Sequence, residues 1–245
     1  MHSPVHDFRI TMKLTSAAQQ AIQEIHSAAV VATNVFWDMQ CCDADFPPNE
    51  NPNVDYDKIA IRFICSSAII RMADSYQWYN GQILRAIAKH DKSAFEKIEV
   101  GVNLTAKDLR MIAQGHDAIE IAVESIRLKD RAVREYLHKS LSFWKEDEME
   151  VIVELRNCFA HHLGVDYCGF ILEWLKSGKS AWDLKPHIRL EGDKVYFSEG
   201  AVHTCQSISL AQISIFDQQA ANVCKLPTSP HMPQTGAKRS RRGRS

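Results

Sequence analysis

Apolar residues recur every three or four positions along the first part of the chain. From residue 16 to about residue 41 this spacing predicts an amphipathic helix, and Ser16-Ala-Ala-Gln19 has the form of a capping box at its start. Residues 43–54 contain three prolines and three asparagines, so we expect a surface loop there. From Asp57 to about Gly81 the chain is apolar almost all round, which predicts a second long helix in the middle of a bundle.

The rest of the chain is helical in pattern, with one exception. Thr105-Ala-Lys-Asp108 has an N-cap signature, and the apolar spacing after it predicts a helix to about Leu128. Residues 188–197 alternate between apolar and polar positions around Gly192-Asp193, which is typical of a β-hairpin. Further helices are expected over residues 83–87, 133–143, 146–164, 167–176 and 207–224.

These elements predict an all-α fold, an antiparallel helical bundle with a small C-terminal β-hairpin appendage. We expect an N-terminal segment (1–15), one helical domain (16–226) that includes the hairpin at 187–198, and a disordered basic tail (227–245). The tail is rich in proline and cations, so it cannot form a core of its own.

The composition is that of an ordinary globular protein, with 45% hydrophobic and 24% charged residues. No stretch is apolar for long enough to predict a membrane span, and the first sixteen residues, MHSPVHDFRITMKLTS, lack the apolar core of a secretion signal. Seven cysteines without CxxC spacing predict reduced thiols. We therefore expect a cytoplasmic protein with no membrane partner.

The net charge of −1 is unevenly distributed along the chain. The last eight residues, KRSRRGRS, carry five positive charges, which leaves the rest of the protein at −6. Proteins that grip nucleic acid over a broad surface are usually basic overall. Any chemistry on nucleic acid must therefore depend on a local site.

One predicted helix, at about residues 146–164, carries the residues that point to chemistry. Its expected buried stripe consists of Met149, Ile152, Leu155, Phe159 and Leu163. Arg156 and His161 flank this stripe about 140° apart on an ideal helix, so only the long arginine side chain would let them share a pocket. Asn157 lies four residues before His161 on the same face. Gly164 suits a left-handed cap, which places His161 and His162 in the last turn, where the helix dipole favours a cation.

This pattern also predicts the effect of substitutions on stability. Because Arg156 and His161 flank the stripe, we expect replacing either one by Ala to cost about 1 kcal/mol or less. Phe159→Ala, as a core truncation, is expected to cost about 3–5 kcal/mol.

The segment Arg156-Asn157-Cys158-Phe159-Ala160-His161 resembles the Arg-x4-His motif of the HEPN superfamily of small helical domains, many of which are metal-independent ribonucleases in bacterial toxin and antiviral systems. The position at a helix end, the Asn after the Arg and the Gly soon after the His add to the resemblance, which covers roughly residues 16–180. The variant of the family with Tyr two residues after the His is absent, because that position is Leu163.

The resemblance implies a metal-independent endoribonuclease that acts as a toxin or antiviral defence effector. It assigns Arg156 to the scissile phosphate, His161 to proton transfer at the 2′-hydroxyl or the leaving oxygen, and Asn157 to orienting either group. His162 is a further candidate for substrate binding. The resemblance also implies RNA as substrate, a homodimer that brings two motifs together, an inhibitor protein or antitoxin as a further partner, and no cofactor or metal.

Three other interpretations stay open. A noncatalytic module of the same fold would dimerise or bind a nucleotide or a protein. Alternatively, Arg156 and His161 are structural and only hold the bundle together. A zinc set of Cys158, His161, His162 and Cys168 is the third, although its spacing matches no standard ligand pattern. Asp74, inside an apolar helix, is a candidate to face the motif.

Overall fold

The computed structural model describes residues 13–41, 55–90, 104–125, 147–177 and 182–230, and most of these residues are helical. The expected all-α class is confirmed at this level. The predicted loop at 43–54 and the predicted helix at 133–143 lie outside the described residues. Within the described ranges, no helix combines the length and the apolar character that crossing a membrane requires.

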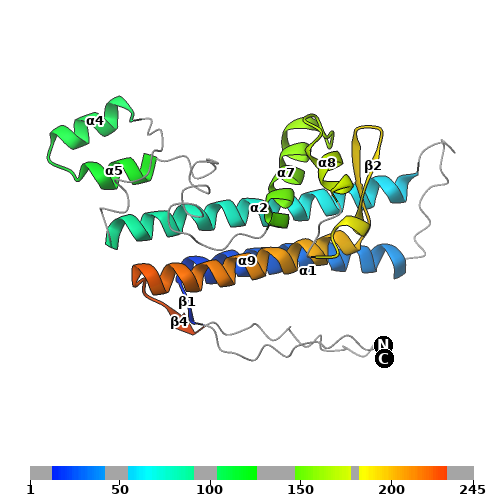
Figure 1. Ribbon diagram of the computed structural model, residues 1–245, viewed down its shortest axis with the longest axis horizontal. Helices are drawn as coiled ribbons and strands as arrows, with labels where there is room; N and C mark the ends of the chain where they lie inside the picture. The colour runs from blue at the N-terminus through cyan, green and yellow to red at the C-terminus, as the bar shows by residue number, and fades with distance from the viewer. Residues whose placement is uncertain (1–12, 42–54, 91–103, 126–146, 178–181, 231–245) are drawn as a thin grey trace, which may run out of the picture.

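Three long helices form the frame of the molecule: α1 (Ser16–Cys41), α2 (Tyr56–His90) and α9 (Gly200–Cys224). They run side by side, and each packs against the other two (Figure 1). α2 also contacts α5 (Ala118–Ser125), α7 (Asp147–His162) and strand β3 (Lys194–Phe197). The predicted central position of this helix is confirmed, and its many neighbours explain why its sequence is apolar almost all round.

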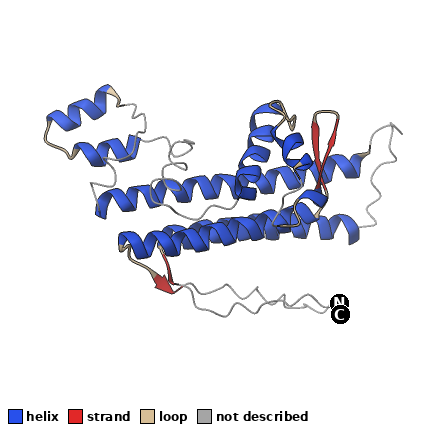
Figure 2. Cartoon of the chain, viewed as in Figure 1, coloured by secondary structure: helices blue, strands red, loops and turns tan. Residues whose placement is uncertain are grey.

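A second layer, formed by α7, α8 (Phe170–Lys176) and the predicted hairpin, lies across α2 from α1 and α9 (Figure 1). The hairpin follows a single 3₁₀ turn at Lys185–His187. Its first strand, β2 (Ile188–Glu191), pairs with β3, and Ile188 lies opposite Phe197. The hairpin is attached to the segment after α7, because the Val195 N–H donates to the Gly164 carbonyl and the Asp166 N–H to the Asp193 carbonyl. Figure 2 shows this hairpin and a second, smaller strand pair against the helices.

Two predictions about helix boundaries are wrong. α2 does not end at Gly81 but continues to His90, because Ile83, Leu84 and Ile87 are all buried. Their burial outweighs the roughly 1 kcal/mol by which a mid-helix glycine is unfavourable. The predicted helix from 105 to 128 is instead broken into α4 (Ala106–Ala113) and α5, with Gly115 in the left-handed region at φ 91° between them.

Helix α1 starts at Ser16 as predicted, but its capping residue and the start of α9 differ from the prediction. The cap of α1 is Thr15, not Ser16, because the Thr15 hydroxyl accepts from the Ala18 N–H at 3.2 Å. α9 starts at Gly200, seven residues before the predicted 207, and the extra turns bury Ala201 and Val202 completely. The capping box at Thr105, with Asp108, is confirmed.

The two ends of the described chain meet in a short sheet. Strand β1 (Lys13–Leu14) pairs with β4 (Ser229–Pro230), and the Gln19 side chain donates to the carbonyls of Leu14 and Ser229. Regular structure therefore extends three residues before and four residues after the predicted 16–226 domain. The rest of the predicted tail, from residue 231, lies outside the described residues.

The carboxylate of Asp217 on α9 links all three long helices. The residue has no exposed surface. It accepts from the Thr15 backbone N–H at 2.7 Å, from the Thr15 hydroxyl at 2.6 Å and from the Tyr79 hydroxyl at 3.1 Å. Burial raises the pKa of Asp217 above its ordinary value even though these three donors act in the opposite direction. The pKa of Tyr79 is also raised, by its burial and by the neighbouring carboxylate.

Replacing Asp217 should therefore change both the size and the pH dependence of stability. Asp217→Ala should cost about 3 kcal/mol, because it leaves buried donors without an acceptor. A raised pKa means that the folded state holds the proton more tightly than the unfolded state, whose value is near 3.8. The free energy of unfolding of the wild type, measured relative to Asp217→Asn, should therefore fall as the pH rises from about 3.8 through the folded-state pKa.

Ser209→Ala is the matched control, since it removes a buried hydroxyl of α9 that donates to Met149 Sδ and does not titrate. Its effect on urea unfolding should be the same at every pH. The raised pKa of Asp217 is contradicted if the free energy of unfolding of the wild type, relative to Asp217→Asn, stays constant or increases as the pH rises.

Candidate active site

α7 holds its apolar stripe against α2 and α9. Met149, Ile152 and Leu155 are fully buried, as predicted. Leu163 was expected to continue the stripe, and this is wrong: the helix ends at His162, and the Leu163 side chain is 87% exposed. Phe159 is only partly buried, packed on Phe197 with ring centroids 5.1 Å apart, so its truncation should cost less than the 3–5 kcal/mol expected from the sequence.

Arg156 does not lie on the surface as the sequence analysis assumed. It is 8% exposed, and its Nε donates to Asp74 Oδ1 of α2 at 3.1 Å, an ion pair that joins the two helices. Asp74 therefore faces the motif, as was suggested. A buried arginine contributes packing as well as charge, so Arg156→Ala should cost more than the 1 kcal/mol expected earlier.

The other side of the same guanidinium group reaches His161. Arg156 Nη1 lies 3.0 Å from His161 Nε2 and 3.2 Å from Asn157 Oδ1. Because a guanidinium has no acceptor, Nη1 must donate, and His161 Nε2 accepts with its lone pair. The structure thus brings Arg156, Asn157 and His161 together, with His161 exposed and its Nε2 in the form that can take up a proton.

Asn157 has a second partner on its own helix. Its Nδ2 donates to Glu154 Oε2 at 3.3 Å, which leaves Oδ1 directed at Arg156. Within the described residues, Arg156 Nη2 has no hydrogen-bond partner, whereas Nε has one and Nη1 has two. The arrangement can therefore offer an anion one guanidinium edge beside an exposed imidazole.

The turn after α7 is held by a residue that the sequence analysis did not identify. Arg62 of α2 donates through Nη2 to the carbonyls of Leu163 and Gly164, and through Nε to the carbonyl of Val195. The Gly164 N–H donates to the Cys158 carbonyl, and Gly164 adopts φ 80°. A Cβ there would lie 2.6 Å from Phe159 Cε1 and closer still to Arg62, so only glycine fits.

His162 and Tyr167 form a stacked pair beside this turn. Their rings are inclined by 14° with centroids 5.3 Å apart, and the His161 and His162 rings lie 6.3 Å apart. Both histidines are exposed, and Tyr167 is 81% exposed. The helix expected over residues 167–176 starts only at Phe170, so Tyr167 lies in the irregular segment between α7 and α8.

The residues considered for zinc do not form a ligand set. Among the described residues, no group of three or more His, Cys, Asp or Glu side chains is placed to hold a metal ion. Cys158 is buried, and desolvation raises the pKa of its thiol to about 12, so it stays protonated at neutral pH. Cys168 is exposed on the loop before α8.

Charges of both signs surround the motif. Asp74 and Glu154 lie close to Arg156 and offset its positive charge. A cationic cluster lies nearby at the hairpin, where the Tyr196 ring is contacted by Lys58, Arg62 and Arg189 at 4.3, 5.0 and 5.7 Å from its centroid. Glu191 pairs with two of these cations, so positive charge prevails within the cluster.

Comparison of the sequence with protein-family models, with curated proteins and with solved structures gives no match.

The contacts of Arg156 predict unequal effects of the two motif substitutions on stability. Arg156→Ala should lower the free energy of unfolding by roughly 2–3 kcal/mol, because it removes a cation from the partly buried Asp74 carboxylate and leaves space between α2 and α7. His161→Ala should change it by about 0.5 kcal/mol or less, because the ring is exposed. Urea denaturation measures both effects without adding salt.

A double-mutant cycle of Arg156→Ala with Asp74→Asn isolates the ion pair, and a coupling energy of about 0.5–2 kcal/mol is expected. The matched control is Arg71→Ala, which breaks the exposed Arg71–Glu24 pair between α2 and α1 and should cost about 0.5 kcal/mol or less. Additive effects of the Arg156 and Asp74 substitutions would contradict an interhelical role of this pair.

Proposed function

We propose that this protein is a HEPN-type, metal-independent endoribonuclease. The observation that supports the proposal most directly is the 3.0 Å contact between Arg156 Nη1 and His161 Nε2, which joins a phosphate-binding group to an exposed base. The two residues are five positions apart in the sequence, and the length of the arginine side chain overcomes their divergence on the helix.

The chemistry assigns one step to each group. His161 Nε2 takes the proton of a 2′-hydroxyl, and that oxygen attacks the neighbouring phosphorus as the bond to the 5′-oxygen breaks. Arg156 neutralises the charge that builds up on the phosphate, and Asn157 keeps the guanidinium in position. When the phosphate binds Nη1, it displaces His161 Nε2 from that donor and frees its lone pair. The products are a 2′,3′-cyclic phosphate and a 5′-hydroxyl.

The leaving 5′-oxygen needs a proton, which a second, protonated His161 supplies when two copies of the chain face each other. Such a homodimer would also double the positive charge at the RNA phosphates, which matters because the protein outside its tail carries −6. We infer an RNA-degrading effector of toxin or antiviral type in the cytoplasm, held in check by an inhibitor protein.

One observation favours a second candidate, in which Arg156 and His161 are structural and only hold the bundle together. Arg156 is 8% exposed and ion-paired with Asp74, as expected of a residue that holds two helices together. The same bond, however, fixes the guanidinium plane so that Nη1 meets His161. The two candidates therefore differ in whether His161→Ala changes an activity without changing stability.

RNA cleavage should survive excess EDTA and should produce 2′,3′-cyclic phosphate ends. A substrate with a 2′-deoxy nucleotide at the cleaved position should resist, because it lacks the attacking oxygen. His161→Ala should lower kcat at least about 100-fold, the usual contribution of a general base. The readout is gel analysis of a labelled RNA, with the ends identified by mass spectrometry.

His203→Ala is the matched control, since it removes an exposed imidazole of α9 that belongs to neither the motif nor its surroundings and should keep kcat. The proposal fails if chelation abolishes cleavage and added zinc or magnesium restores it, or if the 2′-deoxy substrate is cut equally well. Equal activity of wild type and His161→Ala would indicate a contaminating nuclease.

The active form should be a two-fold dimer in which the two α7 C-terminal ends face each other. Multi-angle light scattering at the assay concentration should give twice the chain mass of 27.8 kDa. A monomer with full activity would show that one motif is sufficient and would remove the second His161 from the mechanism.

A further inference from the structure

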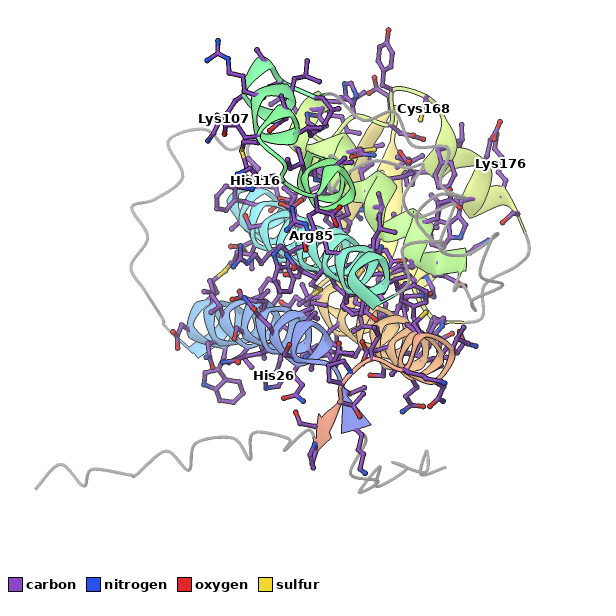
Figure 3. The ribbon with its side chains drawn as sticks, turned by 90° about the vertical axis from the view of Figure 1, so that its left-hand side faces the viewer. His26, Arg85, Lys107, His116, Cys168 and Lys176 are labelled. Atoms are coloured by element: carbon purple, nitrogen blue, oxygen red, sulfur yellow. The ribbon has the colours of Figure 1, made fainter. Side chains whose placement is uncertain are left out.

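The rings of His162 and Tyr167, here named the aromatic platform, lie at the outer surface of the molecule next to the Arg156–His161 pair. His162 covers one face of the Tyr167 ring in a near-parallel stack, and Tyr167 is 81% exposed, so the other face of its ring is open. Cys168, the next residue, projects at the surface far from α1 and α9 (Figure 3). Proteins that bind single-stranded nucleic acid stack unpaired bases on exposed aromatic side chains of this kind.

The backbone beside the platform is strained and firmly held. Leu163 adopts φ 54°, a left-handed conformation that is unfavourable for a residue other than glycine, and its side chain is 87% exposed. Arg62 fixes this conformation through its hydrogen bonds to the carbonyls of Leu163 and Gly164. The backbone that follows His162 is thereby held in one conformation, with the exposed apolar side chain of Leu163 beside it.

The side chains from Arg156 to Tyr167 lie one after another along the surface, in an order that an RNA strand can follow. Arg156 contacts His161 at 3.0 Å, the His161 and His162 rings are 6.3 Å apart, and the His162 and Tyr167 rings are 5.3 Å apart. A strand whose phosphate contacts Arg156 and His161 therefore brings a flanking nucleotide within reach of the platform. Because the open face of Tyr167 is uncharged, it suits a base better than a further phosphate.

We propose that the aromatic platform binds one nucleobase of single-stranded RNA, in the nucleotide next to the cleaved phosphate. The base stacks on the open face of Tyr167, and Leu163 contacts its edge. This inference rests on the proposed ribonuclease function, because the cleaved phosphate sets which nucleotide reaches the platform. Stacking makes no demand on base identity, so the platform holds the strand in place and favours purines only through their larger ring area.

The test separates binding from cleavage by using RNA in which fluorine replaces every 2′-hydroxyl, so that no 2′-oxygen can attack. One 2-aminopurine is placed at each position of this oligonucleotide in turn. In the wild type its fluorescence should be quenched at the position that stacks. Tyr167→Phe should keep this quenching, whereas Tyr167→Ala should abolish it and raise Kd about tenfold or more.

Two controls make the result specific. Trp37→Ala removes an aromatic residue of α1 that is 59% exposed and remote from the motif, and it should bind like the wild type. On cleavable RNA, Tyr167→Ala should raise KM with little change in kcat, whereas His161→Ala should lower kcat. Urea unfolding should be unchanged in the Tyr167 variants, because the ring is exposed.

The outcomes distinguish this inference from the proposed function. If the wild type cleaves RNA but Tyr167→Ala matches it in Kd, KM and quenching, the platform is wrong and the nuclease assignment stands. If the fluorinated oligonucleotide is quenched through Tyr167 while RNA is not cleaved, the platform is supported and the nuclease assignment fails. No binding of the oligonucleotide to the wild type overturns the platform.

Discussion

A carboxylate with no exposed surface sets the register of the three long helices. Asp217 of α9 accepts from Thr15 at the start of α1 and from Tyr79 in the middle of α2. An unpaired oxygen at this depth would cost several kcal/mol, so the three helices must meet at this one point. α7 packs against both α2 and α9, and the part of α2 that it contacts carries Asp74.

Asp74 imposes a compromise on the candidate site. Its bond to Arg156 Nε holds the guanidinium in one orientation, and a preorganised group need not be ordered again when a phosphate arrives. The same carboxylate lowers the positive potential that attracts the phosphate, and Glu154 adds to this effect through Asn157. The site is therefore better suited to positioning a phosphate than to capturing one. Attraction has to come from elsewhere, and the cluster of cations around Tyr196 is one source among the described residues.

The sequence predicted those features that depend on local pattern. The range of α1, the start of α7 at the acidic run and the hairpin around Gly192 follow from periodicity, dipole preference and turn chemistry. Features that depend on tertiary contacts were missed. Gly81 does not end α2 because residues beyond it are buried, and Arg156 is not at the surface because α2 supplies a carboxylate to pair with it. Leu163 matched the spacing of the stripe, but the helix ends one residue earlier, and periodicity cannot detect that.

Both anchors of the motif belong to α2. Asp74 orients Arg156, and Arg62, about 18 Å away along the same helix at 1.5 Å per residue, fixes the turn that carries His162. The motif residues are neighbours in sequence, yet their relative orientation is set by two side chains that lie 82 and 101 positions before the residues they bind. The distance between the anchors is constant only while α2 is a continuous helix. The long uninterrupted α2, buried by helices on both sides, is therefore what keeps Arg156, His161 and the aromatic platform in one arrangement.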